Sequence, residues 1–157
     1  MENSEAITAF WQRYLDSLPA EAPEREQGYV AEAFGDNPAL SDELGALVLA
    51  GRKTATCSVL WEWEAQGEAL PQPGFKTVLL DGQGRPLCVI ETTAVEVKAF
   101  DQVEADFAYA EGEGERSLAY WRQAHWRAFG RSLALIGKAP QEAMPLVCER
   151  FQVVFRG

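Results

Sequence analysis

The sequence has one histidine, three cysteines and no long apolar run, and each of these scarcities excludes a class of protein. Cys57, Cys88 and Cys148 lie far apart and His125 stands alone, so the ligand spacing of a zinc site is absent. The chain also lacks a Gly-x-Ser-x-Gly motif and a glycine-rich phosphate-binding motif. No apolar stretch approaches the roughly 20 residues that cross a bilayer. We therefore expect no metal, no other cofactor and no membrane partner.

The beginning of the chain lacks the features of a secretory signal. Residues 1–5 contain neither a basic region nor an apolar core. An odd number of cysteines in such a chain is typical of reduced thiols in the cytoplasm. We therefore predict a cytoplasmic location, with the three thiols acting as small buried hydrophobes.

Basic residues are scarce, with 14 lysines and arginines against 24 acidic residues and a net charge of −10. Such a charge repels long double-stranded nucleic acid, because phosphate contacts dominate non-specific affinity. The charge is uneven, however: residues 1–50 hold two basic and ten acidic side chains, whereas no acid lies between Arg116 and Lys138. This basic stretch could bind a nucleoside, a short RNA or a small anion. The alternative is a solvated face that offsets the acidic N-terminal part, and the oligomeric state is left open.

Helical spacing of apolar residues marks three segments. Residues 4–18 predict an amphipathic helix with Ser4 as its N-cap. Ser41 predicts the cap of a second helix, which Gly51 ends because glycine accepts the left-handed conformation. Ser117 predicts the cap of a third helix that runs to about Phe129.

Strand patterns fill the middle and the end of the chain. Residues 76–81 and 86–100 flank a tight turn and predict a hairpin, and residues 146–155 predict a closing strand. Helices first and strands later favour an α+β fold, with a small, mostly antiparallel β-barrel or curled sheet flanked by helices. We predict one domain over residues 1–157, in which residues 1–40 form an N-terminal helical extension.

The segment Gly51-Arg52-Lys53-Thr54-Ala55-Thr56 joins a predicted helix to a predicted strand. Such a rigid corner can hold the amine of Lys53 and the hydroxyl of Thr56 together at the opening of one pocket. A lysine that loses its proton in a pocket can deprotonate a hydroxyl. The alternative is an exposed lysine followed by threonines that favour a strand.

The segment Glu111-Gly112-Glu113-Gly114-Glu115 places three carboxylates close together. Their charges repel unless a cation or a polar ligand lies among them. One of them could serve as a general base or hold the amino group of a ligand. The alternative is an acidic surface loop ahead of a helix N-terminus, where glutamate is favourable.

Aromatic side chains lie near these polar segments. Trp61 and Trp63 alternate with Glu62 and Glu64 as in a strand. Trp121 and His125 share one face of the third helix, with Arg122 beside them. Such rings can stack on a nucleobase. The alternative is core packing, with His125 as a hydrogen-bonded core residue.

Together these segments resemble the ASCH family, a relative of the PUA-type RNA-binding barrels. The match runs in family order from about Trp11 to Phe155. The corner, the Glu-Gly-Glu-Gly loop and the Trp-x-x-x-His pattern are specific as a set. The segments that carry the resemblance are Leu47 to Thr56, Gly74, Pro86 to Thr93, Ala110 to Gly114, Trp121 to His125, and Val147 to Phe151.

The resemblance implies a β-barrel whose cleft is lined by the lysine–threonine corner and the acidic loop. Some members are amidohydrolases that remove the acetyl group of N4-acetylcytidine with a lysine, a threonine and a glutamate. These positions fall on Lys53, Thr56 and Glu113, with Glu111 as the second candidate for the carboxylate. Other members resemble ribonucleases or RNA-binding domains, which is the alternative function for the same cleft. The substrate-binding residues that follow from this resemblance are Arg52, Thr54, Trp61, Glu111, Trp121, Arg122 and His125, and the expected partner is a small nucleoside or a short RNA.

Overall fold

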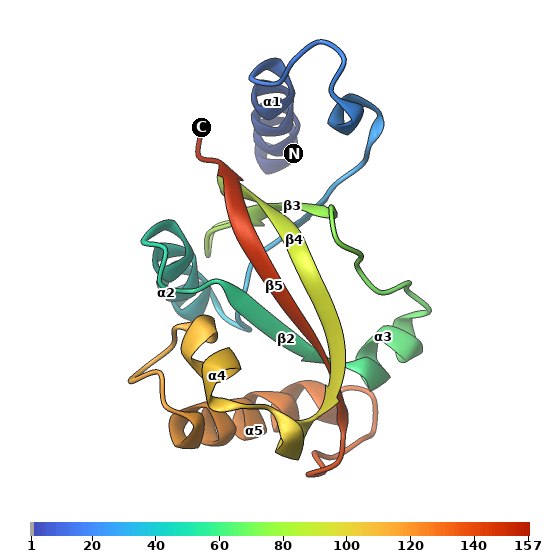
Figure 1. Ribbon diagram of the computed structural model, residues 1–157, viewed down its shortest axis with the longest axis vertical. Helices are drawn as coiled ribbons and strands as arrows, with labels where there is room; N and C mark the ends of the chain where they lie inside the picture. The colour runs from blue at the N-terminus through green and yellow to red at the C-terminus, as the bar shows by residue number, and fades with distance from the viewer. Residues whose placement is uncertain (1) are drawn as a thin grey trace.

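Within residues 2–157, the part of the chain that the computed structural model describes, five α-helices and two short 3-10 helices surround five strands (Figure 1). The elements in chain order are α1 (Glu2–Asp16), η1 (Pro23–Glu26), β1 (Val30–Glu32), α2 (Pro38–Leu49), β2 (Ala55–Val59), α3 (Leu60–Gln66), β3 (Lys76–Leu80), β4 (Pro86–Ala99), η2 (Phe100–Gln102), α4 (Ala105–Glu111), α5 (Leu118–Ala134) and β5 (Pro145–Phe155). In the described chain, no helix has the length and apolar character that crossing a membrane requires.

The five strands form one sheet in the order β1-β3-β4-β5-β2. Strands β1 and β3 are parallel, and the other three pairs are antiparallel. The long pair β4–β5 shifts register at Val89/Ile90 and at Thr92/Ala94, and such bulges bend strands. The sheet consequently curls into a half-barrel with β1 and β2 at its two edges (Figure 1). The predicted α+β class with a mostly antiparallel curled sheet is confirmed.

Two predicted helix starts are wrong. Helix α1 already begins at Glu2, so Ser4 lies inside it, and its carbonyl accepts a hydrogen bond from Thr8. Helix α2 is capped by Asn37, whose side chain accepts from the Leu40 amide at 2.9 Å. Ser41 lies one turn further on and is buried. Asparagine caps as well as serine does, and the following proline is favoured at the first helical position, so the stronger signal lies upstream.

The other predicted elements are mostly confirmed. The hairpin is β3–β4 and the closing strand is β5. Ser117 caps α5 by accepting from the Tyr120 amide at 3.1 Å, and the helix continues to Ala134. The strand-like alternation around Trp61 is wrong, because this segment is helix α3. Gly67 ends α3 in the left-handed conformation, which is a common helix terminus. This local signal for a helix is stronger than the short alternation of tryptophan and glutamate.

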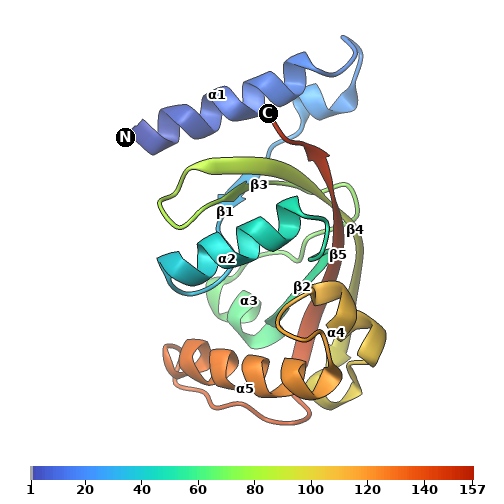
Figure 2. The same cartoon turned by 90° about the vertical axis from the view of Figure 1, so that its left-hand side faces the viewer.

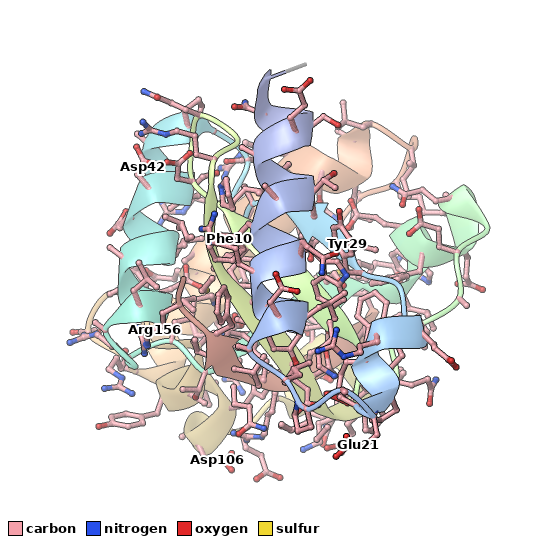
Figure 3. The ribbon with its side chains drawn as sticks, turned by 90° about the horizontal axis from the view of Figure 1, so that it is seen from above. Phe10, Glu21, Tyr29, Asp42, Asp106 and Arg156 are labelled. Atoms are coloured by element: carbon pink, nitrogen blue, oxygen red, sulfur yellow. The ribbon has the colours of Figure 1, made fainter. Side chains whose placement is uncertain are left out.

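The first helix covers one end of the sheet. Phe10, Trp11, Tyr14 and Leu15 of α1 pack with Val78 and Val89 of the hairpin, and Figure 2 shows α1 lying across β3. The segment 1–40, predicted as a helical extension, holds α1 and η1, and its residues 30–32 form the edge strand β1. In Figure 3, seen from above, Arg156 lies at the end of α2, where its guanidinium donates to the Leu49 carbonyl at 2.8 Å.

Candidate functional site

A cleft of about 390 Å³ lies along the edge strand β2 and is bordered by α2, α3 and α5. Three segments that are distant in sequence meet there: the corner after α2, the loop after α4 and one face of α5. The sequence-predicted residues that line the cleft are Lys53, Thr56, Glu111, Glu113 and His125. The cleft therefore brings together the amine, the hydroxyl and both candidate carboxylates.

The corner turns the chain sharply between α2 and β2. Gly51 adopts a φ of +76°, as its predicted role at the end of the helix requires. The amides of Arg52 and Lys53 both donate to the Leu47 carbonyl, at 3.0 and 3.1 Å. The Thr54 amide then donates to the Ala110 carbonyl at 2.7 Å, which ties the corner to α4. These bonds direct the Lys53 side chain inward.

The Lys53 ammonium is 2% exposed and lies between two carboxylates. Its Nζ donates to the Ala55 carbonyl at 2.9 Å, to Glu111 Oε1 at 3.0 Å and to Glu113 Oε2 at 3.0 Å. Burial lowers the pKa of Lys53, but the charges of the two carboxylates outweigh it and hold this pKa above its ordinary value. Lys53 is thus a cation in the cleft, which is at odds with the expectation that it loses its proton.

Glu111 is the centre of a buried network and is only 1% exposed. Besides Lys53, it accepts hydrogen bonds from the Trp121 indole, from Cys57 Sγ at 3.3 Å and from His125 Nε2 at 3.1 Å. Burial raises the pKa of Glu111, but the charges of Lys53 and His125 and these hydrogen bonds lower it well below the usual range. Glu111 therefore remains a charged group that holds its neighbours in place.

Trp121 and His125 are held by this network from one face of α5. Their rings stack with centroids 4.5 Å apart, and Trp121 stacks on Phe100 at 5.2 Å. His125 Nδ1 lies 2.9 Å from the Trp121 carbonyl. Burial lowers the pKa of His125, but the Glu111 charge and its hydrogen bond raise it above the ordinary value. The two ring nitrogens of His125 thus both have acceptors as partners, as an imidazolium requires.

The side chain of Arg52 binds the backbone of the acidic loop. Gly112 ends α4 with a φ of +72°. Arg52 donates from Nε to the Gly112 carbonyl at 2.9 Å and from Nη2 to the Gly114 carbonyl at 2.7 Å. The guanidinium of Arg52, predicted to bind substrate, therefore holds the loop that carries Glu113. Glu113 itself is 20% exposed and faces the cleft.

Five predicted residues do not line the cleft: Arg52 and Trp121, which hold the loop and Glu111, and three others. Thr54 is exposed, and its hydroxyl donates to the Ala110 carbonyl at 3.3 Å. Trp61 packs against the core, with the Lys138 ammonium 5.6 Å from its ring centroid. Arg122 lies on the outer face of α5, in a separate groove with Trp126 and Arg127. Trp63, which follows Trp61 on the helix α3, lines the cleft in its place, and its indole donates to Ser58 at 2.7 Å.

The balance of charge in the cleft is acidic. Its lining has two permanent cations, Lys53 and Arg131, and the single imidazole of His125. The carboxylates of the lining are Glu32, Asp36, Glu62, Glu111, Glu113 and Glu149. An excess of carboxylates repels a phosphate group and favours a neutral or amine-bearing ligand.

Cys57, Glu111 and His125 place a thiol, a carboxylate and an imidazole within 4.8 Å of one another, close enough to hold a metal ion. The donor set does not fit one. Glu111 already accepts from its neighbours, and the Lys53 ammonium lies 3.0 Å from it. Burial and the Glu111 charge raise the pKa of the Cys57 thiol well above its ordinary value, whereas a metal needs the thiolate. Hydrogen bonding explains this cluster.

Glu149 is a further carboxylate of the cleft that the sequence reasoning missed. It lies on β5, where its Cα pairs with that of Thr56 on β2. Thr92 donates to Glu149 Oε1 at 3.4 Å. Burial and the charge of Glu32 raise the pKa of Glu149 to about 7. Only a pairing of strands far apart in sequence brings this group to Thr56, so no local signal could have identified it.

We expect Glu149→Gln to stabilise the fold at pH 8 but not at pH 4. A carboxyl whose pKa is higher folded than unfolded stabilises the fold below the unfolded value of 4.5, and this contribution is lost as the pH rises through about 7. The ionised group therefore costs about 2 kcal/mol at pH 8, after discounting for partial exposure. Urea unfolding of both proteins at both pH values measures the difference. An equal effect at pH 4 and pH 8 would contradict it.

The curled half-barrel and the cleft on its edge strand define a class, the PUA-like domains with a lysine–threonine corner. The chain belongs to the ASCH family, which matches it over residues 30–155. An ASCH domain from Lactobacillus crispatus JV V101 is 36% identical over 97% of this chain and 96% of its own, with a TM-score of 0.92. A protein of Enterococcus faecalis V583 is 38% identical over 97% of this chain and 90% of its own, with a TM-score of 0.85. No curated protein matches the chain.

Proposed function

We propose that this ASCH protein is an amidohydrolase that removes the acyl group of N4-acetylcytidine or a similar nucleoside. The observation that carries the proposal is that Lys53, Thr56 and Glu113 line one acidic cleft. Hydroxyl attack on an amide carbonyl needs a nucleophile, a proton acceptor and a charged group that keeps the others in position. The lining of this cleft supplies all three.

The surroundings of each residue suggest its role. Thr56, at the second position of the edge strand β2, would attack the amide carbonyl. Lys53 stays protonated and holds the Glu113 carboxylate at 3.0 Å, so it acts by charge and positioning. Glu113 is the partly exposed member of the pair and would pass a proton to the leaving amine or orient water. Glu111, at 3.0 Å from the Lys53 ammonium, would keep Lys53 in place.

Size and charge favour a nucleoside over a phosphate-bearing ligand in the cleft. A volume of about 390 Å³ lies within the range of small-molecule sites. The rings of Phe34 and Trp63 line it and could pack against a base. The excess of carboxylates repels the backbone of an RNA, whereas the uncharged ribose of a nucleoside meets no such barrier.

A second candidate function, binding of single-stranded RNA, has support on the outer face of α5. Arg122, Trp126 and Arg127 line a groove of about 550 Å³ there, and Trp126 is 38% exposed. Arginines beside an exposed ring are the usual means of holding a strand by its phosphates and bases. RNA would then bind outside the acidic cleft, and Arg122→Ala with Arg127→Ala would weaken a salt-sensitive complex.

The test is turnover of N4-acetylcytidine by the full chain, measured as release of cytidine. We expect Thr56→Val and Glu113→Gln each to lower kcat at least about 100-fold, because each removes a group that takes part in bond making or proton transfer. Both side chains are partly exposed, so unfolding midpoints close to that of the wild type should show that the fold survives.

Arg122→Ala is the matched control, since its side chain lies in the outer groove and not in the cleft. Its turnover should equal that of the wild type. A Thr56→Val variant with wild-type turnover would contradict the proposal. An inert wild type would exclude this substrate, and salt-dependent binding of a short RNA would then favour the second candidate.

A further inference from the structure

We propose that Glu149 is the general base of this cleft, which accepts the proton of the Thr56 hydroxyl. The inference rests on the proposed function, since it assigns the proton acceptor for the nucleophile named there. It does not depend on N4-acetylcytidine being the natural acyl donor. It replaces Lys53, which the resemblance suggested for this task.

The register of the sheet places the two side chains together. Thr56 on β2 pairs with Glu149 on β5 in an antiparallel ladder. Directly opposite residues project from the same face, with Cβ atoms about 4.5–5.5 Å apart. Both side chains line the cleft. No direct hydrogen bond joins them, and a carboxylate at this separation reaches a hydroxyl by rotating or through one water.

Glu149 is also free for this task. Glu111 has Lys53 and His125 as partners, and Glu113 has Lys53. Among the described residues, no cation pairs with Glu149, and the one side chain that donates to it is Thr92, at 3.4 Å. A half-buried carboxylate without a cation destabilises a fold. Stability therefore does not explain the presence of Glu149 in the cleft, and a functional role does.

The charges around Glu149 set its proton affinity. Glu32 faces it from β1, and Thr92 and Thr56 face it from β4 and β2. Burial and Glu32 raise its pKa to about 7, which is close to the value that serves a general base best at neutral pH. The remaining ionisable groups of the cleft are Asp36, Lys53, Cys57, Glu62, Glu111, Glu113, His125 and Arg131.

Other acceptors in the cleft are less suited. Lys53 carries its proton, because two carboxylates raise its pKa. His125 directs one ring nitrogen to the Trp121 carbonyl and the other to Glu111, so neither is free. Glu113 lies against Lys53 on the loop after α4, whereas Glu149 is the strand neighbour of Thr56.

The cleft supplies every group that the step needs. The Thr56 hydroxyl proton moves to the Glu149 carboxylate as its oxygen bonds to the acyl carbon. The carbon–nitrogen bond then breaks, and Glu149 gives this proton to the leaving amine. Water, oriented by Glu113, attacks the acyl-threonine ester and gives one proton to Glu149. The bond between the acyl carbon and Thr56 Oγ1 then breaks, Glu149 returns the proton to this oxygen, and the carboxylic acid leaves. The net reaction is amide plus water to amine plus acid.

The experiment is acetylation of Thr56 by p-nitrophenyl acetate, an activated ester that releases p-nitrophenolate. Peptide mass mapping identifies the acetylated residue, and the rate is followed from pH 5 to pH 9. In the wild type we expect the rate to rise with a midpoint near pH 7. Glu149→Gln should slow acetylation at least about 100-fold and remove this rise. Glu32→Gln should lower the midpoint, because it removes a charge that raises the pKa of Glu149.

Two controls separate this role from a structural one. Glu96→Gln replaces an exposed carboxylate on β4 that pairs with Lys98, and it should leave the rate and midpoint unchanged. Thr56→Val should abolish the acetylated peptide. Wild-type rates and midpoint in a folded Glu149→Gln, or no acetylation of Thr56 in the wild type, would overturn the proposal.

Turnover of N4-acetylcytidine, measured in parallel, distinguishes the two proposals. Turnover that survives Glu149→Gln would keep the amidohydrolase and overturn the role of Glu149. Acetylation of Thr56 that requires Glu149, in a protein inert toward N4-acetylcytidine, would support the role of Glu149 and reject that substrate.

Discussion

Replacing Lys53 with methionine should destabilise the fold by about 3–5 kcal/mol at neutral pH. The substitution keeps most of the side-chain volume but leaves Glu111, which is 1% exposed, without its ammonium partner. Glu111 would then keep only His125 of the two cations it contacts, and a buried charge that is no longer fully compensated costs far more than the pair itself contributes. Urea unfolding followed by tryptophan fluorescence measures the loss.

A double variant and a surface pair serve as controls. Lys53→Met with Glu111→Gln removes both charges and should recover much of the loss, which a double-mutant cycle quantifies. Arg85→Met breaks an exposed pair with Asp81, in which Arg85 is 62% exposed, and should cost less than about 1 kcal/mol. If Lys53→Met cost no more than Arg85→Met, the network would not support the fold. Lys53→Ala, for the same reason, is a poor test of catalysis.

Gly112→Ala should cost about 3 kcal/mol or more and disrupt the site. Gly112 has a φ of +72°, which an L side chain adopts only with strain. A Cβ there would also overlap the Arg52 carbonyl group, whose carbon lies 2.7 Å away, and the Cα of Lys53 at 2.9 Å. Backbone cannot yield as a flexible side chain can, so the loop would move and carry Glu111 and Glu113 away from Lys53.

Gly67→Ala is the matched control. Gly67 has a φ of +66° at the end of α3, but nothing lies within 4 Å of a Cβ built there. It should therefore cost about 1 kcal/mol, the conformational part alone. Urea unfolding gives the loss in unfolding free energy for each variant. The difference between the two losses measures the cost of crowding the loop against the corner. Equal losses would show that this approach does not hold the site.

Local signals predicted the elements that depend on local physics. The corner depends on the positive φ of Gly51, and the start of α5 depends on one hydrogen bond to Ser117. The β3–β4 hairpin depends on apolar residues in neighbouring strands that are joined by a short turn. Helix α3 was missed because its segment is only seven residues long, too short for its tryptophan spacing to distinguish a helical period from a strand period. The edge strand β1 is three residues long and pairs in parallel with a distant strand, so it left no local pattern.

The sequence by itself determined the family, the α+β class and the residues of the corner and the acidic loop, because these depend on residue types at fixed spacing. Tertiary structure decided what each residue does. It buried Glu111 and left Glu113 partly exposed, although they lie two residues apart, because Gly112 turns the chain between them. It placed Arg52 on the loop and Trp63 in the cleft. It also set Glu149 opposite Thr56, a meeting that strand register alone can create.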